Sequence, residues 1–297
     1  MKKLSKILSS FKFKIDESRI NEKINSIISK TLSNEERINY LKLAVSIIDL
    51  TTLEGSDTKD KVVTMCKKAI KPLGKIDFPY CAAICIYPNL IKYAKKTVKG
   101  SKVKVASVAT AFPSGQFPLK LKLLDVKYCI EEGAREIDMV ISRGEFLSGN
   151  YDYVFDEIKK VKKVCTNTKK KKPAHLKVIL ETGELGSLEN VWKASFIAML
   201  AGADFIKTST GKIPVAATLP VVYVMCEAIK FFYQKTGVKI GIKAAGGIRT
   251  AKDAIEYILL VKEILGEEWL TQKLFRIGAS SLLNDLLKEY KELNSKS

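Results

Sequence analysis

The chain has 297 residues, of which 46% are hydrophobic, and its formal net charge is +19 at pH 7. That hydrophobic content is enough for one large core or two ordinary ones. No apolar run approaches the roughly 20 residues that a membrane-spanning helix needs, which excludes a helical membrane protein. We therefore expect a soluble protein with no membrane partner.

The positive charge raises the question of nucleic-acid binding, because phosphate backbones attract basic proteins. Most of the surplus is lysine, spread along presumed helix faces and concentrated at 169–172, whereas arginine is scarce. Nucleic-acid-binding surfaces favour arginine and exposed aromatic side chains, and the sequence contains no such cluster. We therefore expect a solvated lysine-rich surface, no nucleic-acid partner, and a basic field that attracts an anionic substrate.

The cysteines and the single histidine argue against a metal site. The six cysteines are scattered without a metal-ligand pattern, at Cys66, Cys81, Cys85, Cys129, Cys165 and Cys226. Most lie in apolar patterns, as reduced core cysteines do, so we expect a reducing, cytoplasmic setting. His175 is the only histidine, which excludes a multi-histidine metal site.

Residues 1–40 differ from the rest of the chain, and we assign them to an N-terminal extension that precedes a barrel domain at 41–297. Residues 1–14 are basic and contain no acid. This composition is weakly similar to an organelle-targeting peptide, but we favour a disordered or helical extension. Residues 21–32 carry apolar side chains at helical spacing, which predicts a helix that packs against the barrel.

Eight short apolar runs follow, with room for a helix between successive runs: 46–50, 82–87, 103–110, 136–141, 176–181, 204–208, 238–244 and 274–278. Continuous apolar runs are typical of strands buried on both faces, as in parallel sheets. Helical patterns lie between them, for example at 151–165 and 188–201. Strand–helix alternation eight times over predicts an α/β fold, a TIM (β/α)₈ barrel. An open doubly wound sheet is the alternative, but no Gly-x-Gly-x-x-Gly turn follows the first run.

Lys207 and Lys243 lie inside strand-like apolar runs, and so does Asp138. Burial disfavours the charged form of an amine, so a buried lysine tends to become a nucleophile. If all three face the barrel axis, a neutral lysine can attack a carbonyl and form a Schiff base while Asp138 transfers protons. A buried ion pair is the structural alternative for each residue, but three on different strands favour a functional site.

Polar residues at the carboxyl ends of barrel strands are the usual catalytic and binding positions. The first run ends near Asp49 and Thr51, and the sixth run leads into Thr208 and Ser209. We therefore assign these four residues to substrate binding.

Glycine-rich turns after the last three runs indicate a phosphate site, with eight candidate residues: Gly211, Lys212, Gly246, Gly247, Arg249, Gly278, Ser280 and Ser281. Each motif alone is also explained by a simple turn or by a helix cap. Their placement is typical of the phosphate site of such barrels. We expect serine to cap the amphipathic helix at 282–293 and to leave backbone N–H groups free for an anion.

These motifs resemble the deoxyribose-phosphate aldolase family over about residues 43–287, and the segments 203–212 and 243–250 are the most specific. The resemblance implies a TIM barrel that reversibly cleaves 2-deoxy-D-ribose 5-phosphate to acetaldehyde and D-glyceraldehyde 3-phosphate, in deoxyribose phosphate catabolism. It implies that Lys207 forms the Schiff base, that Lys243 tunes it, and that Asp138 relays protons. It also places Cys85 among the substrate residues and implies a small phosphorylated sugar as partner, with no metal and no organic cofactor. We expect a homodimer.

The sequence departs from the family pattern at three places. Ala244 stands where many relatives have proline, the match at 109–115 is looser, and 292–297 lack the C-terminal tyrosine that some relatives use as a proton shuttle. Another Schiff-base barrel, such as a transaldolase or a sugar-bisphosphate aldolase, is the alternative enzyme. A basic barrel that binds nucleic acid is the non-enzymatic alternative.

Overall fold

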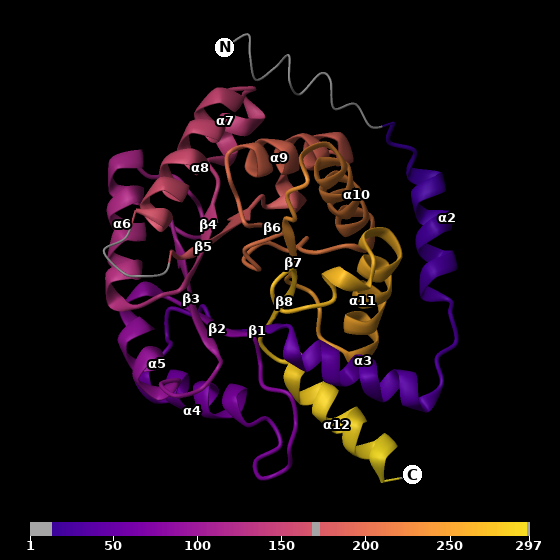
Figure 1. Ribbon diagram of the computed structural model, residues 1–297. Helices are drawn as coiled ribbons and strands as arrows, with labels where there is room; N and C mark the ends of the chain where they lie inside the picture. The colour runs from indigo at the N-terminus through magenta and orange to yellow at the C-terminus, as the bar shows by residue number, and fades with distance from the viewer. Residues whose placement is uncertain (1–13, 168–172, 296–297) are drawn as a thin grey trace.

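The computed structural model describes residues 14–167 and 173–295, and its centre is a closed barrel of eight parallel strands (Figure 1). Each strand pairs with the next, and β8 pairs with β1. The strands are β1 Ile48–Thr51, β2 Ala83–Ile86, β3 Lys104–Ala109, β4 Glu136–Val140, β5 His175–Ile179, β6 Phe205–Lys207, β7 Gly241–Ala245 and β8 Phe275–Ala279. This closure confirms the predicted TIM barrel. Every strand overlaps the run from which it was predicted.

Most strand boundaries differ from the prediction by one residue or more, and two of the larger differences have a clear cause in the backbone. β5 ends at Ile179, and Glu181 has a left-handed backbone with φ 55° that ends the strand direction. β7 begins at Gly241 rather than at Val238, which is half exposed and follows the left-handed Gly237. At β5 the left-handed backbone of Glu181 turns the chain out of the strand direction within the apolar run, and at β7 the run starts directly after the turn at Gly237, before the strand begins.

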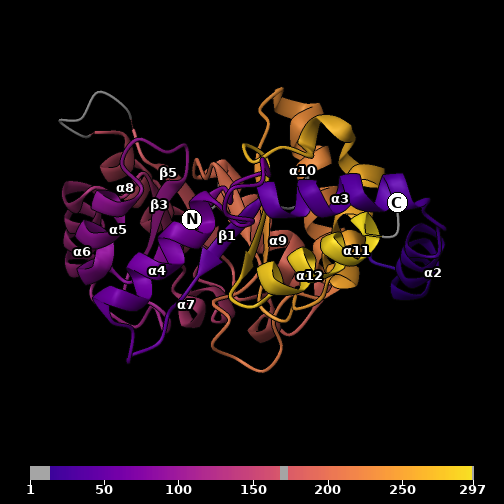
Figure 2. The same cartoon turned by 90° about the horizontal axis from the view of Figure 1, so that it is seen from below.

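Helices surround the barrel, and the apolar faces of helices and strands form the main core between them (Figures 1 and 2). The helices after β1 are α4 Lys59–Ile70, α5 Ile91–Thr97, α6 Leu119–Glu132, α7 Arg143–Leu147, α8 Tyr151–Thr166, α9 Leu188–Leu200, α10 Leu219–Thr236, α11 Ala251–Leu265 and α12 Leu282–Asn294, with 3₁₀ turns at Pro88–Leu90, Thr182–Glu184 and Glu267–Trp269. The helices expected at 151–165 and 188–201 are α8 and α9. In the described part of the chain, no helix is long and apolar enough to cross a membrane.

Two further helices precede the barrel, α2 Glu17–Ile28 and α3 Asn34–Ser46. The helix predicted at 21–32 is α2, which begins earlier because the side chain of Asp16 accepts a hydrogen bond from the backbone of Arg19. Its buried isoleucines contact α10 and α11 (Figure 1). The prediction for residues 1–14 lies almost entirely outside the described residues, as does the lysine run at 169–172. Since α3 crosses residue 40, the division at that position stays a prediction.

The inside of the barrel is unequally filled. β2 and β3 contribute mainly small or apolar inward side chains, Ala83, Cys85, Ala106 and Val108, which form a cluster separate from the main core. The other strands place long charged side chains at neighbouring positions, such as Lys207 beside Lys243. Small residues on one side therefore leave room for long charged ones on the other.

We predict that Gly241→Ala destabilises the barrel, because a Cβ there would lie 2.4 Å from the ring of Phe205. Overpacking of this kind typically costs about 1–3 kcal/mol, so the midpoint of thermal unfolding, measured by circular dichroism, should fall. Gly55→Ala is the matched control, since a Cβ at Gly55 has no neighbour within 4 Å. Equal losses in both variants would contradict this account of Gly241.

Candidate active site

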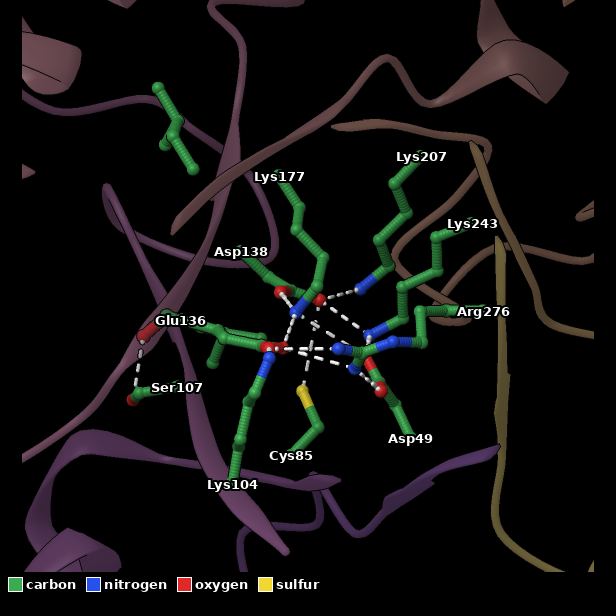
Figure 3. Close-up of polar contacts among 12 residues, drawn as sticks. Asp49, Cys85, Lys104, Ser107, Glu136, Asp138, Lys177, Lys207, Lys243 and Arg276 are labelled. Atoms are coloured by element: carbon green, nitrogen blue, oxygen red, sulfur yellow. Dashed lines mark hydrogen bonds and ion pairs between the residues drawn. The ribbon is translucent and has the colours of Figure 1, made fainter. Parts of the chain in front are cut away.

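Seven charged side chains from six strands meet inside the barrel, and each is at most 2% exposed (Figure 3). Three are carboxylates and four are bases: Asp49, Glu136, Asp138, Lys177, Lys207, Lys243 and Arg276. We call them the charge network. Strand register aligns Lys207 with Lys243, and Lys243 with Arg276, so three bases stand side by side on β6, β7 and β8. Buried positive charges this close together need carboxylates across the barrel to offset them, and β1 and β4 supply these carboxylates.

Asp138 is the centre of one part of the charge network, in which it accepts hydrogen bonds from three lysines. Its Oδ2 accepts hydrogen bonds from Lys207 Nζ at 2.8 Å and from Lys243 Nζ at 2.7 Å. Its Oδ1 accepts one from Lys177 Nζ at 3.0 Å. The structure therefore brings together the three residues that we predicted to be catalytic.

In the other part of the charge network, the guanidinium group of Arg276 lies between two carboxylates. Arg276 donates to both carboxylate oxygens of Glu136, at 2.8 and 3.1 Å, and also to Asp49. Lys177 Nζ lies 2.6 Å from Glu136 Oε2, which links the two parts. In the described residues, no group of three or more His, Cys, Asp or Glu side chains is arranged to hold a metal ion.

Three members of the charge network were not predicted to be site residues: Glu136, Lys177 and Arg276. Glu136 lies two residues before Asp138, and side chains two apart on a strand share a face. Lys177 and Arg276 are charged residues within apolar runs, the same signal that pointed to Lys207. These signals could have identified all three.

With four bases and three acids in the network, loss of one proton from a base balances the buried charge. Burial lowers the pKa of Lys207, and the neighbouring Lys243 lowers it further, against the opposing effect of Asp138. Burial alone would also lower the pKa of Lys243, but Asp138 and Asp49 raise it above its usual value. The pKa of Lys177 is likewise raised, by three carboxylates that offset its burial. Among the three lysines of the network, Lys207 is therefore the one whose lowered pKa favours the neutral amine.

A cleft of about 810 Å³ opens over Lys207 at the carboxyl ends of the strands. It is lined by Lys207, by Thr51, and by all eight candidate phosphate residues, Gly211, Lys212, Gly246, Gly247, Arg249, Gly278, Ser280 and Ser281. A volume of this size suits a small ligand. Lys207 and the candidate phosphate residues thus belong to one cleft.

The other candidate substrate residues do not line this cleft. Asp49 belongs to the charge network, and Cys85 lies beneath with its Sγ 3.8 Å from Asp138 Oδ2. Burial raises the pKa of the Cys85 thiol, which keeps it uncharged. Thr208 Oγ1 donates to the carbonyl of Ala245 and accepts from its backbone N–H, so it joins β6 to β7. Ser209 Oγ is buried and has no hydrogen-bond partner in the structure.

The expectation that serine caps the last helix is wrong. Ser281 precedes α12 with helical dihedral angles, φ −100° and ψ −22°, and its side chain makes no capping hydrogen bond. An N-cap side chain reaches the backbone from extended geometry, which Ser281 does not have. Any anion binding at this helix start therefore depends on backbone N–H groups and on the exposed serine hydroxyl groups.

Glu181 shapes the turn that carries Gly211 and Lys212. It is fully buried, and it accepts hydrogen bonds from Thr210 N at 3.0 Å and from Thr210 Oγ1 at 2.5 Å. Arg143 also donates to Glu181, at 3.1 Å. At the mouth of the cleft, Lys212 Nζ lies 2.8 Å from Glu54 Oε1. The turn is thus held rigid from below, while Lys212 has an exposed carboxylate as its partner.

Residues 43–288 match the model of the DeoC/LacD family aldolases. The chain belongs to this family. This aldolase is 49% identical over 271 residues to the deoxyribose-phosphate aldolases of Mus musculus and Homo sapiens, which covers 88% of this chain and 83% of each relative. The solved deoxyribose-phosphate aldolase from Aeropyrum pernix, described as a tetramer, matches with a TM-score of 0.67 and 25% identity, over 88% of this chain and all of that one. The predicted family resemblance is confirmed, whereas the homodimer stays a prediction.

We predict that Lys243→Leu raises the pKa of Lys207 in this aldolase. Removing the adjacent cation favours the charged form of Lys207, so its neutral amine should form only at higher pH. The measurement is the pH dependence of reductive methylation at Lys207, followed by mass spectrometry, with the exposed Lys230 in the same sample as the reference.

Lys243→Arg retains the positive charge, so it should shift the labelling of Lys207 less than Lys243→Leu does. An unchanged pH dependence in Lys243→Leu would show that Lys243 does not tune Lys207.

Proposed function

We propose that this aldolase reversibly cleaves 2-deoxy-D-ribose 5-phosphate to D-glyceraldehyde 3-phosphate and acetaldehyde through a Schiff base on Lys207. The proposed setting is the breakdown of deoxyribose phosphate in the cytoplasm. One observation carries the proposal: the buried amine with a lowered pKa lies in the same cleft as the glycine-rich turns and the cations Lys212 and Arg249. The relatives named as deoxyribose-phosphate aldolases support the choice of substrate.

In the proposed first step, the neutral Nζ of Lys207 attacks the C1 aldehyde of the open-chain sugar and forms a carbinolamine. Uptake of one proton from solvent and loss of water then give a protonated Schiff base, the iminium. The C3 hydroxyl then loses its proton and the C2–C3 bond breaks. The bond electrons move onto the iminium and form an enamine, which releases D-glyceraldehyde 3-phosphate. Protonation of the enamine at C2 and hydrolysis of the new iminium release acetaldehyde and restore Lys207.

The charge network is compatible with the changes in charge that the buried site undergoes during these steps. With Lys207 neutral, the buried acids and bases balance, and the iminium adds one positive charge to the same low-dielectric space. Bond cleavage removes that charge, because the enamine is neutral, so burial favours the electron flow that breaks the bond. We assign proton transfer to Asp138, with Lys243 as its hydrogen-bonded partner at 2.7 Å.

The iminium is itself the electron sink, so the proposed reaction needs neither a metal ion nor an organic cofactor. At the other end of the substrate, we assign the phosphate to the eight candidate residues of the cleft, with Thr51 nearer the sugar. Thr208 and Ser209 are buried behind the cleft wall, so we assign them support of the strand end that carries Lys207 rather than contact with the sugar. Asp49 and Cys85 act from beneath, where they contact Lys243 and Asp138. Dialysis against a chelator should accordingly leave the rate of cleavage unchanged.

We predict that acetaldehyde and borohydride together attach an ethyl group to Lys207, because reduction traps the Schiff base as a stable amine. Peptide mass spectrometry locates the modification. Lys207→Met should abolish both the adduct and the cleavage of deoxyribose 5-phosphate. An adduct at another lysine that persists in Lys207→Met would overturn the assignment.

A substrate panel separates this proposal from the other Schiff-base barrels. The protein should release acetaldehyde from deoxyribose 5-phosphate and should not transfer dihydroxyacetone units between sugar phosphates. Transfer without acetaldehyde release would favour a transaldolase.

We predict that Arg249→Ala weakens recognition of the phosphate without changing the reacting end of the sugar. Loss of one hydrogen bond to a charged group costs about 1.5–3 kcal/mol, so kcat/KM for deoxyribose 5-phosphate should fall roughly 10- to 100-fold. The kcat/KM for unphosphorylated 2-deoxyribose, measured in parallel, should change little. Equal losses for both sugars would remove Arg249 from the phosphate site.

A further inference from the structure

A second cleft, of about 920 Å³, lies at the opposite end of the barrel from Lys207. It is bounded by the end of α5, by the start of β3 and by the turn between α6 and β4; α5 and α6 lie side by side (Figure 1). Arg135 and six lysines line it: Lys92, Lys95, Lys96, Lys99, Lys102 and Lys104. We call it the basic cleft. Its only acidic lining residues are Glu131 and Glu132.

Several of these cations have no protein counter-charge. Lys96, Lys99 and Lys102 are exposed, and the ammonium group of none of them makes an ion pair or hydrogen bond with the described residues. Lys95 Nζ donates only to a backbone carbonyl, that of Glu132 at 3.3 Å. A cleft that is lined by charges of one sign focuses their electrostatic field. These lysines therefore create a strongly positive local potential.

Helix electrostatics explain only part of the grouping. Lysines in the last turn of a helix are stabilised by its dipole, which accounts for Lys95 and Lys96 in α5. Lys99 and Lys102 lie beyond that helix, and they extend the same positive surface toward β3. The basic cleft thus holds more lysines than stabilisation of the helix dipole explains.

The shape and lining of the basic cleft favour a small soluble anion over a macromolecule. Its volume is that of a small-molecule site. No aromatic side chain lines it, so it lacks the stacking surface on which single-stranded nucleic acid binds. Its apolar lining residues, Val98, Val103 and Val105, are at least 92% buried, so they offer nothing to insert into a lipid surface.

We propose that the basic cleft binds a small soluble molecule that carries several phosphate groups. Several phosphates are required because the unpaired ammonium groups are spread over α5 and the loop that leads to β3. This site is separate from the catalytic cleft and does not depend on the proposed substrate.

The test is isothermal titration with inorganic tripolyphosphate and with inositol hexakisphosphate at physiological salt. The variant carries Lys96→Glu, Lys99→Glu and Lys102→Glu. Lys104 is left unchanged because it lies 3.2 Å from Glu136 of the charge network. The control variant reverses three exposed lysines outside the basic cleft, Lys230→Glu, Lys288→Glu and Lys291→Glu, and has the same net charge.

We expect the wild type and the control variant to bind alike, and the cleft variant to bind at least about tenfold more weakly, a loss of roughly 1.4 kcal/mol. Arg249→Glu, which alters the catalytic cleft, should retain the binding. Unchanged unfolding midpoints and unchanged aldolase activity would show that the cleft variant is folded.

Three results would overturn the proposal. The first is no binding of either probe by the wild type, and the second is an equal loss in the cleft and control variants. The third is binding of RNA or of vesicles containing phosphatidylserine, but of neither soluble probe.

Discussion

The burial of a charge network inside the barrel is the constraint on which the rest of the structure depends. Removing an ion from water costs several kcal/mol even after relaxation, and only close partners offset that cost. In this aldolase, each base of the charge network donates a hydrogen bond to at least one carboxylate. Loss of any one partner would leave an uncompensated charge, so the network has to be assembled as a unit.

This constraint accounts for the unequal filling of the barrel. Long side chains on β4 to β8 reach the axis because β2 and β3 offer alanine and cysteine there. A glycine in β8 serves the same end: a Cβ at Gly278 would lie 3.0 Å from Lys243 Cε. Lys243 therefore occupies space that a side chain on the neighbouring strand would fill.

The charge network also gives its three lysines, which are chemically identical, different surroundings. Lys177, Lys207 and Lys243 all contact Asp138, but Lys177 and Lys243 each contact a further carboxylate. Lys207 has only Asp138 and lies at the floor of the cleft. The number of carboxylate partners thus explains why the pKa is lowered at Lys207 but raised at Lys177 and Lys243.

The sequence by itself determined the barrel and the identity of the central residues. Eight apolar runs with intervening helices leave few alternatives, and Lys207, Lys243 and Asp138 stand out because a charge inside an apolar strand is costly. Only the tertiary structure decided which charges pair with which, because partners such as Asp49 and Lys243 are far apart in the sequence and meet only when the barrel closes. For the same reason, the roles of Glu136 and Arg276, the uncapped start of α12 and the basic cleft follow from distances between strands and helices, which local sequence patterns do not contain.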